Sequence, residues 1–114
     1  MQEPNMTTPK VFDREFNFCL VLWELEPIAA VELSKICKEK FKWSRTTTYT
    51  VIRRLEERGV VKRTNSIVTS LYTKEQIQLS AIEKLIKTRF NDSIPNFISA
   101  IKKSQIMNET KAIK

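Results

Sequence analysis

The sequence predicts a mainly α-helical protein with one small β-hairpin and a helical arm at its C-terminal end. Three observations support this fold class. Apolar residues recur at intervals of three and four over most of the chain, which is the spacing of one helix face. From residue 60 to residue 73 this spacing gives way to β-branched runs, which are typical of strands. After residue 73 the helical spacing returns, with more apolar surface than one small module can bury.

Length and charge limit the possible functions. A chain of 114 residues forms one domain, or one small domain with an arm. Its formal net charge is +7, and residues 32–63 hold ten lysines and arginines against four glutamates. Such a basic segment is typical of a protein that binds a polyanion, and a membrane surface would attract it as well. Because the sequence shows neither a signal peptide nor a long apolar run, we expect a cytoplasmic protein without membrane insertion.

The residue types needed for metal binding and for common catalytic mechanisms are scarce. The chain has no histidine and only two cysteines, Cys19 and Cys37, which both fall on apolar helical faces. We therefore predict buried free thiols in preference to a disulfide. Zinc and copper sites lack ligands, and Ser/His, Cys/His and metal-water catalysis lack their residues. The sequence thus predicts a protein that is not an enzyme and has no cofactor.

The N-terminal third is predicted to form a mobile arm and two helices. Residues 1–10 contain two prolines and mostly polar residues, as in a disordered arm. Asp13 is expected to cap a helix that reaches Leu25, and Pro27 ends it. The apolar seam of this helix is predicted to comprise Phe16, Cys19, Leu20 and Trp23. A second helix is expected over residues 30–40, with an inner face of Leu33, Ile36 and Cys37.

Residues 44–59 carry most of the functional prediction. Ser44 is placed to cap a helix, and Gly59, the only glycine, is placed just past its end, where a positive φ costs glycine little. The inward face is predicted to consist of Thr48, Val51, Ile52 and Leu55. The outer face and first turn carry hydroxyls, one aromatic ring and arginine, from Ser44, Arg45, Thr46, Thr47, Tyr49, Thr50 and Arg53. Short polar groups backed by arginine suit base edges and phosphates in a major groove.

A solvated polar face is the alternative interpretation of this helix, with Glu57 paired to Arg53 or Arg54 at the surface. Three consecutive threonines argue against it, because β-branched residues are poor choices for an idle helix surface. A helix, a short turn and this second helix follow one another along the chain. The sequence therefore predicts a helix-turn-helix that binds double-stranded DNA.

Residues 60–73 are predicted to form a β-hairpin with a polar tip at Thr64-Asn65-Ser66. A hairpin directly after a recognition helix is a wing, so the predicted fold is a winged helix-turn-helix. Lys62, Arg63 and Asn65 are then expected to reach phosphates or a minor groove. An ordinary surface hairpin is the alternative, and the two cations beside the tip favour contact with DNA.

The C-terminal arm is predicted to make a homodimer. A helix over residues 74–90 carries two apolar stripes, and another, which starts at Asp92 or Ser93 with Pro95 in its first turn, reaches about residue 103. Two stripes need two packing partners, and a second copy of the chain can supply one. The predicted dimer contacts are Ile77, Ala81, Leu85, Ile94, Phe97, Ile98 and Ile101. The expected division is a flexible arm at 1–10, a DNA-binding domain at 11–73 and a dimerisation region with a frayed tail at 74–114.

Several short motifs resemble landmarks of the BlaI/MecI/CopY family of bacterial repressors. They are Asp13-Arg14-Glu15-Phe16, Leu22-Trp23, Trp43-Ser44, Thr47, Thr50, Arg54-Leu55, Arg58-Gly59 and Ser70-Leu71-Tyr72. The match covers roughly residues 11–107, and the Trp-Ser-x-x-Thr-x-x-Thr run is a fairly specific part of it. The resemblance implies a dimeric winged-helix repressor that binds palindromic operators.

The resemblance also implies how such a repressor is switched off. In the β-lactam-responsive branch, which is linked to antibiotic resistance, a membrane sensor-protease system cleaves the C-terminal part at an Asn-Phe bond and releases DNA. This implies a sensor-linked protease as a partner and Asn96-Phe97 as the cleaved bond. Core packing of Phe97 is the alternative interpretation of that pair.

The chain departs from the family pattern in three places. Members often carry basic residues where this chain has Thr46 and Tyr49, so no operator sequence carries over. The chain lacks the Cys-x-Cys motif of the copper-responsive branch, so copper sensing is not expected. It also leaves room for at most a stub of the family's last helix.

A second function class remains open from the residues alone, namely a winged-helix module whose outer face binds protein. The basic segment and the threonine-rich helix favour DNA, because a protein-binding face needs no such concentration of positive charge.

Overall fold

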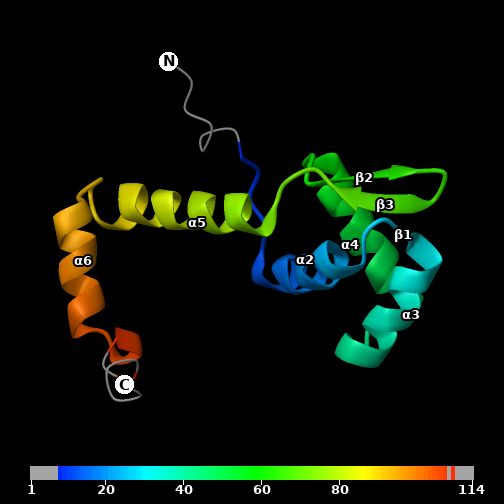
Figure 1. The fold of residues 1–114 in the computed structure, drawn as a ribbon, viewed down its shortest axis with the longest axis horizontal. Coiled ribbons are helices and arrows are strands. Elements are labelled where there is room, and N and C mark those ends of the chain that lie inside the picture. Colours follow the sequence, from blue (N-terminus) through cyan, green and yellow to red (C-terminus); the bar gives the residue numbers. More distant parts are fainter. Residues whose placement is uncertain (1–7, 108, 110–114) are drawn as a thin grey trace.

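The structure is a computed structural model that describes residues 8–107 and 109. In chain order its elements are α2 (Asp13–Leu25), β1 (Ile28–Ala29), α3 (Ala30–Phe41), α4 (Arg45–Glu57), β2 (Val61–Thr64), β3 (Ile67–Ser70), α5 (Lys74–Arg89) and α6 (Ile94–Lys103). Figure 1 shows α2, α3, α4 and the strands gathered in one module, from which α5 projects to a corner with α6. The predicted fold class, mainly helical with a small β-wing, is confirmed.

The three strands form one antiparallel sheet in the order β1-β3-β2. In the wing, Thr64 pairs with Ile67, and the turn between them has positive φ angles of 53° at Asn65 and 68° at Ser66. Two-residue hairpin turns with this geometry match the twist of the flanking strands, and asparagine tolerates it well. The predicted hairpin is therefore confirmed, with its turn at the predicted polar tip.

Strand β1 was not predicted from the sequence. It consists of only Ile28 and Ala29, which pair with Val68 and Ile67 of β3. A two-residue segment has no measurable period, so only its pairing with a distant strand defines it. The backbone N–H of Ala30 continues this ladder by donating to the carbonyl of Ser66 at 2.8 Å. The pairing fixes the start of α3 to the wing.

The core lies between the sheet and the first three helices. Its largest fully buried apolar side chains are Phe18, Leu22, Leu33, Ile52, Leu55, Val60, Val61 and Val68. Trp43, on the loop before α4, stacks on Phe18 with ring centroids 6.3 Å apart. Fully burying a side chain of this size stabilises a fold by about 1.5–3 kcal/mol. Every one of these residues precedes residue 74, so the winged module contains its own core.

Cys19 and Cys37 are buried and free, as predicted. Burial, with a smaller effect of the Glu15 and Glu26 charges, raises the pKa of the Cys19 thiol to about 12. Burial also raises the pKa of Cys37. Because the thiolate is the reactive form of cysteine, both side chains are poor nucleophiles at neutral pH. They act as small apolar core residues.

Two predictions about α2 were wrong in detail. Phe12, in extended conformation, is the N-cap, and Asp13 is the first helical residue. The Glu15 carboxylate accepts from the backbone N–H of Phe12 at 2.9 Å, so the expected capping role of Asp13 is taken by Glu15. The buried face is also shifted from the predicted seam and consists of Glu15, Phe18, Cys19, Val21 and Leu22. The predicted seam residues Phe16, Leu20 and Trp23 are only half-buried.

The two C-terminal helices have clear start signals but little packing within the chain. The Thr73 hydroxyl accepts from the Gln76 N–H at 3.1 Å, and the Ser93 hydroxyl accepts from the Asn96 N–H at 3.2 Å. Ile77 is the one buried residue of α5, and α6 has none. The radius of gyration is 17.0 Å, whereas a compact domain of this size has about 13 Å. In residues 8–107 and 109, no helix is long and apolar enough to cross a membrane.

Candidate nucleic-acid interface

Helix α4 begins and ends as the sequence predicts. Ser44 is its N-cap, and the Ser44 hydroxyl accepts from the backbone N–H of Thr47 at 3.1 Å. The Ser44 and Thr47 hydroxyl oxygens also lie 3.0 Å apart, within hydrogen-bond distance. At the other end Gly59 has a φ of 77°, a conformation that glycine adopts without the penalty of a Cβ atom. Two of the predicted DNA-contacting residues, Ser44 and Thr47, therefore fix the first turn of the helix.

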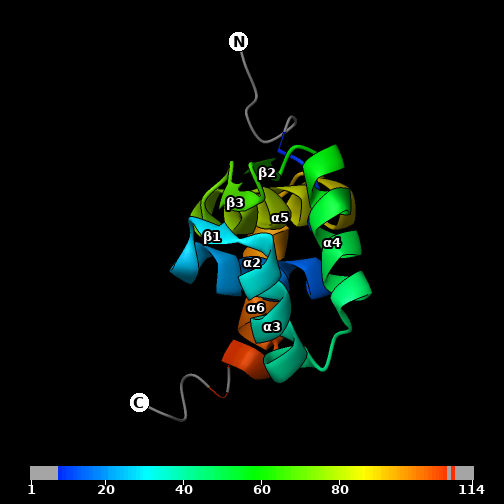
Figure 2. The same ribbon diagram turned by 90° about the vertical axis from the view of Figure 1, so that its right-hand side faces the viewer.

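The two faces of α4 are separated as predicted. Thr48, Val51, Ile52 and Leu55 are buried. On the other side, Arg45, Thr46 and Arg53 are exposed, while Tyr49 and Thr50 are half-buried. Tyr49 packs against the edge of the core, and the Cζ atom of Arg45 lies 5.5 Å from the centroid of its ring. Figure 2 shows α4 along one side of the module.

Among the residues that the structure describes, Arg53 has one weak partner. Its Nε atom lies 4.0 Å from a carboxylate oxygen of Glu57, and the two side chains are 59% and 68% exposed. Exposed ion pairs of this kind contribute about 0–1 kcal/mol. The sequence allowed a surface ion pair between Glu57 and either Arg53 or Arg54. In the structure, Glu57 pairs with Arg53. Such a weak interaction leaves the guanidinium able to exchange Glu57 for an external anion.

The cations of the wing differ from each other. Lys62 and Asn65 are exposed. The Nη2 atom of Arg63 instead donates to Glu56 Oε1 at 2.9 Å, and both side chains are about 70% covered, at 29% and 28% exposed. This pair joins the wing to α4. Arg63 is therefore engaged within the protein, which the sequence did not predict, whereas Lys62 is presented to the outside.

Two further arginines beside α4 take positions that the sequence did not reveal. The Cζ atom of Arg14 lies 4.8 Å from the ring centroid of Trp43, just before the N-cap of α4. Arg58, the C-cap, donates to the Lys10 carbonyl at 2.6 Å and forms an ion pair with the buried Glu15. Both contacts join residues far apart in the chain, so no local pattern signals them. Arg14 adds a cation near the start of α4, and Arg58 is engaged by partners within the protein.

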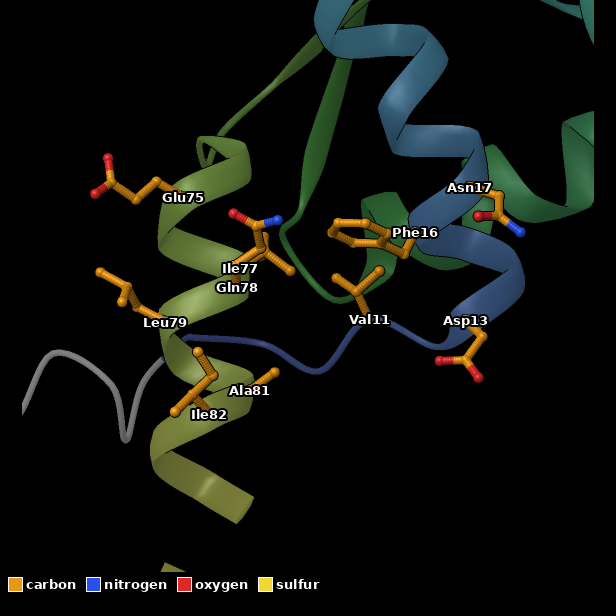
Figure 3. A pocket seen from close by; sticks show the side chains of 10 residues that line it. All are labelled: Val11, Asp13, Phe16, Asn17, Glu75, Ile77, Gln78, Leu79, Ala81 and Ile82. Carbon is orange, nitrogen blue, oxygen red and sulfur yellow. The ribbon is translucent and has the colours of Figure 1, made fainter. Parts of the chain in front are cut away.

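The predicted dimer residues lie on the projecting arm. Ile77 is buried, Phe97 and Ile101 are half-buried, and Ala81, Leu85, Ile94 and Ile98 are exposed. Leu79 and Ile82 of the second α5 stripe are also exposed, at 48% and 43%. A pocket of about 760 Å³ lies between α5 and α2, and Figure 3 shows that Phe16 and Val11 face Ile77 and Ala81 in it. Within the described residues, this apolar surface is left without a covering element.

Comparison with known sequences identifies the class of protein. The sequence model of the penicillinase repressor family matches residues 13–113, nearly the whole chain. The chain belongs to the penicillinase repressor family. This confirms the resemblance predicted from its motifs, and family membership implies a DNA-binding transcriptional repressor, a regulator rather than an enzyme. Comparison with curated proteins gives no match.

The geometry of this family member suits contact with a duplex. A helix with side chains is about 10–12 Å wide and the major groove is about 12 Å wide, so α4 can enter it. Its exposed first turn and outer face would then meet bases, because they carry Arg45, Thr46 and Arg53. The wing, with Lys62 on β2 and Asn65 at its tip, follows the C-terminal end of α4 in the chain. The arrangement can therefore present one reading helix and one flanking cation to the same duplex.

Proposed function

We propose that this protein binds a palindromic operator as a homodimer and that each protomer reads one half-site with α4. The observation that carries the proposal is the outward face of α4, where threonine hydroxyls and arginines lie within the most basic segment of the chain. Arg45, Thr46, Tyr49, Thr50 and Arg53 are the proposed reading residues. Hydrogen bonds and methyl contacts to base edges supply sequence information, while phosphate contacts supply affinity.

The proposal separates the roles of Arg53 and Lys62. Replacing Arg53 or Tyr49 by alanine is expected to reduce discrimination between operator and random DNA by about 1–3 kcal/mol. Lys62→Ala is expected to weaken both affinities about equally and to lower the slope of log affinity against log salt by about one unit. Quantitative binding to selected and random duplexes at several salt concentrations measures both effects.

A matched control distinguishes loss of base contact from loss of the surface ion pair. Glu57→Gln removes the same Arg53–Glu57 pair but keeps the guanidinium, so discrimination should stay at the wild-type level. If Arg53→Ala lowers both affinities equally, Arg53 contacts the backbone. If affinity for duplex DNA does not fall steeply with salt in the wild-type chain, a protein-binding winged helix becomes the better interpretation.

The proposed dimer rests on the uncovered apolar surface of α5 and α6. Five of the large apolar side chains that are more than 40% exposed lie on these two helices: Leu79, Ile82, Leu85, Ile94 and Ile98. Stable interfaces of standard size bury about 800 Å² per partner, and two neighbouring helices can offer such an area. A second copy of the chain covers equivalent stripes on both protomers at once, as two-fold symmetry requires.

The dimer predicts both a mass and a binding defect. Sedimentation should show twice the mass of the chain at micromolar concentration, and a chain that ends at Thr73 should be monomeric. That shortened chain should bind the full operator about 10²–10⁴-fold more weakly, because linked half-site contacts are lost. It should still melt cooperatively, since the core lies before residue 74. A monomer at tens of micromolar would overturn the dimer.

We also propose that cutting the Asn96-Phe97 bond inactivates this repressor, as in the β-lactam-responsive branch of its family. The bond lies in the first turn of α6, where Asn96 is exposed and Phe97 is half-buried. Helix ends open locally at low free-energy cost, and α6 has no buried residue within the protomer. These features support access by a protease after local opening of the helix start.

A further inference from the structure

A cluster of hydrogen bonds joins the end of α2 to the segment that leads from the wing into α5. One carboxylate oxygen of Glu26 accepts from the backbone N–H of Ser70 at 2.6 Å. The Ser70 hydroxyl lies 2.9 Å from that oxygen and 2.8 Å from the other. Hydrogen bonds to an ionised acceptor are about twice as strong as neutral ones. A single glutamate therefore holds the last residue of β3 through its main chain and its side chain.

A second bond of the cluster lies closer to α5. The indole Nε1 atom of Trp23, one turn before Glu26, donates to the backbone carbonyl of Tyr72 at 2.9 Å. The next residue, Thr73, is the N-cap of α5. Both partners are half-buried, as are Glu26 and Ser70. We refer to Trp23, Glu26, Ser70 and Tyr72 together as the α2–β3 clasp.

Among the described residues, few other buried contacts set the direction of α5. Ile77, in its first turn, is the only buried residue of the helix. Beyond it the space between α5 and α2 is the open pocket shown in Figure 3. Thr73 and Gln76 cap the helix reciprocally, which makes its start continuous with residue 73. How firmly residues 70–72 are held therefore contributes directly to the direction of α5, together with the packing of Ile77.

We propose that the α2–β3 clasp fixes the angle at which α5 leaves the winged module and thereby the spacing of the two half-sites that a dimer accepts. This inference rests on the proposed binding of two half-sites by a dimer. A helix of 16 residues is about 24 Å long, so a 10° change at its start displaces its far end by about 4 Å. That displacement exceeds the rise of one base pair, about 3.4 Å.

A role in spacing differs from a role in folding. A residue that only supports the wing would change affinity for a single half-site, because the wing and α4 belong to one module. The clasp instead connects that module to the arm, where the partner is proposed to bind. Loosening it should leave each reading helix intact and should release the constraint between the two. Operators with one base pair added or removed at the centre report on that constraint directly.

The test begins with the wild-type chain. Selection from a random duplex library defines its half-site and its preferred spacing, and sedimentation defines its oligomeric state. Binding is then measured to one half-site and to operators with the preferred spacing and one base pair more or less. We expect the wild type to favour one spacing by at least about tenfold, because avidity collapses when geometry prevents both sites from engaging. A wild-type monomer on DNA would overturn the proposed dimer and, with it, the role in spacing.

The clasp variants are Glu26→Ala, Ser70→Ala and Trp23→Phe, and the last keeps an aromatic ring while removing the N–H donor. In each we expect spacing discrimination to fall below about threefold, with half-site affinity and dimer dissociation constant within twofold of wild type. Ser70→Thr restores a hydroxyl and should restore discrimination. Glu24→Gln, on the exposed side of α2, makes a comparable charge change outside the clasp and should have no effect.

Two results of the binding measurements would overturn the proposal. One is unchanged spacing discrimination in the clasp variants, and the other is a parallel loss of half-site affinity, which would assign the clasp to the wing alone.

A distance measurement without DNA tests the proposal independently. Spin labels on Thr64→Cys and Lys84→Cys report the distance between wing and α5, with labelled chains diluted in unlabelled ones. Cys19 and Cys37 are buried and do not compete for label. We expect Glu26→Ala to broaden or shift this distance distribution, and an unchanged distribution would also refute the proposal.

Discussion

Cutting the chain between Asn96 and Phe97 is expected to release operator DNA while the winged module stays folded. The core residues lie between Phe18 and Val68, and α6 buries no residue within its own protomer. The cut removes Phe97, Ile98 and Ile101 from the proposed dimer interface. Full burial of such a side chain contributes about 1.5–3 kcal/mol. Part of the surface of each side chain is already covered within the protomer. About half of that value for each of the six side chains, three from each protomer, loosens the dimer by roughly three to six powers of ten.

A chain that ends at Asn96 provides the direct measurement. Its thermal transition should match that of a chain that ends at Thr73. Its dimer dissociation constant should exceed that of the full chain by the powers of ten estimated for the loss of Phe97, Ile98 and Ile101. Affinity for the full operator should fall with it, and affinity for a single half-site should not. If the shortened chain dimerises as tightly as the full chain, α5 alone forms the interface and a cut in α6 cannot release DNA.

Induction in the native host tests whether the bond is used. Asn96→Ala changes an exposed side chain at the bond and should block induction by a β-lactam, whereas Ser99→Ala, exposed on the same helix, should not. Phe97→Ala is less informative alone, because the Phe97 ring also lies 5.4 Å from that of Phe90 at the corner between α5 and α6. If uncleaved variants that still dimerise are induced as readily as wild type, the pair serves packing only.

The helices and the wing could be predicted because their signals are local. Ser44 and Gly59 mark the ends of α4 through the hydrogen-bonding capacity of serine and the backbone freedom of glycine. The buried and exposed sides of α4 follow from a period of 3.6 residues. Strand β1 could not be predicted, because two residues have no period and form a strand only against β3. The seam of α2 was misplaced since apolar residues surround that helix, and tertiary packing chose among them.

The candidate site was predictable in outline only. The outer face of α4 follows from spacing, so Thr46 and Arg53 were placed correctly on the exposed surface. Charge alone made Arg58 and Arg63 part of the same basic segment, yet one binds Glu15 and the other Glu56. These pairings depend on where distant elements meet. A count of cations therefore overstates the number that face a ligand, and only the packed structure separates them.

Replacing Arg58 by alanine is expected to cost more stability than replacing any other surface cation beside α4. The guanidinium forms an ion pair with the carboxylate of Glu15, whose side chain is only 9% exposed. It also donates to the Lys10 carbonyl and lies 5.2 Å from the ring centroid of Phe12. Removing one partner of a buried pair costs about 3–5 kcal/mol. Because the Arg58 side chain is itself 28% exposed, we expect about 2–3 kcal/mol, below the fully buried case.

Urea unfolding at one fixed protein concentration measures this effect, since a dimer makes stability depend on concentration. Arg54→Ala is the matched control, because Arg54 lies on the same helix, is exposed and carries the same charge; such surface changes usually stay within about 0.5 kcal/mol. Arg58→Lys keeps the charge but loses the forked geometry of the guanidinium, so its loss of stability should lie between those of Arg54→Ala and Arg58→Ala.

Glu15→Gln combined with Arg58→Ala should cost less stability than the sum of the single changes, because each single change already breaks the same pair. Equal losses for Arg54→Ala and Arg58→Ala would mean that the Glu15 pair does not stabilise the fold, and that Arg58 contributes charge to the surface in the same way as its neighbours.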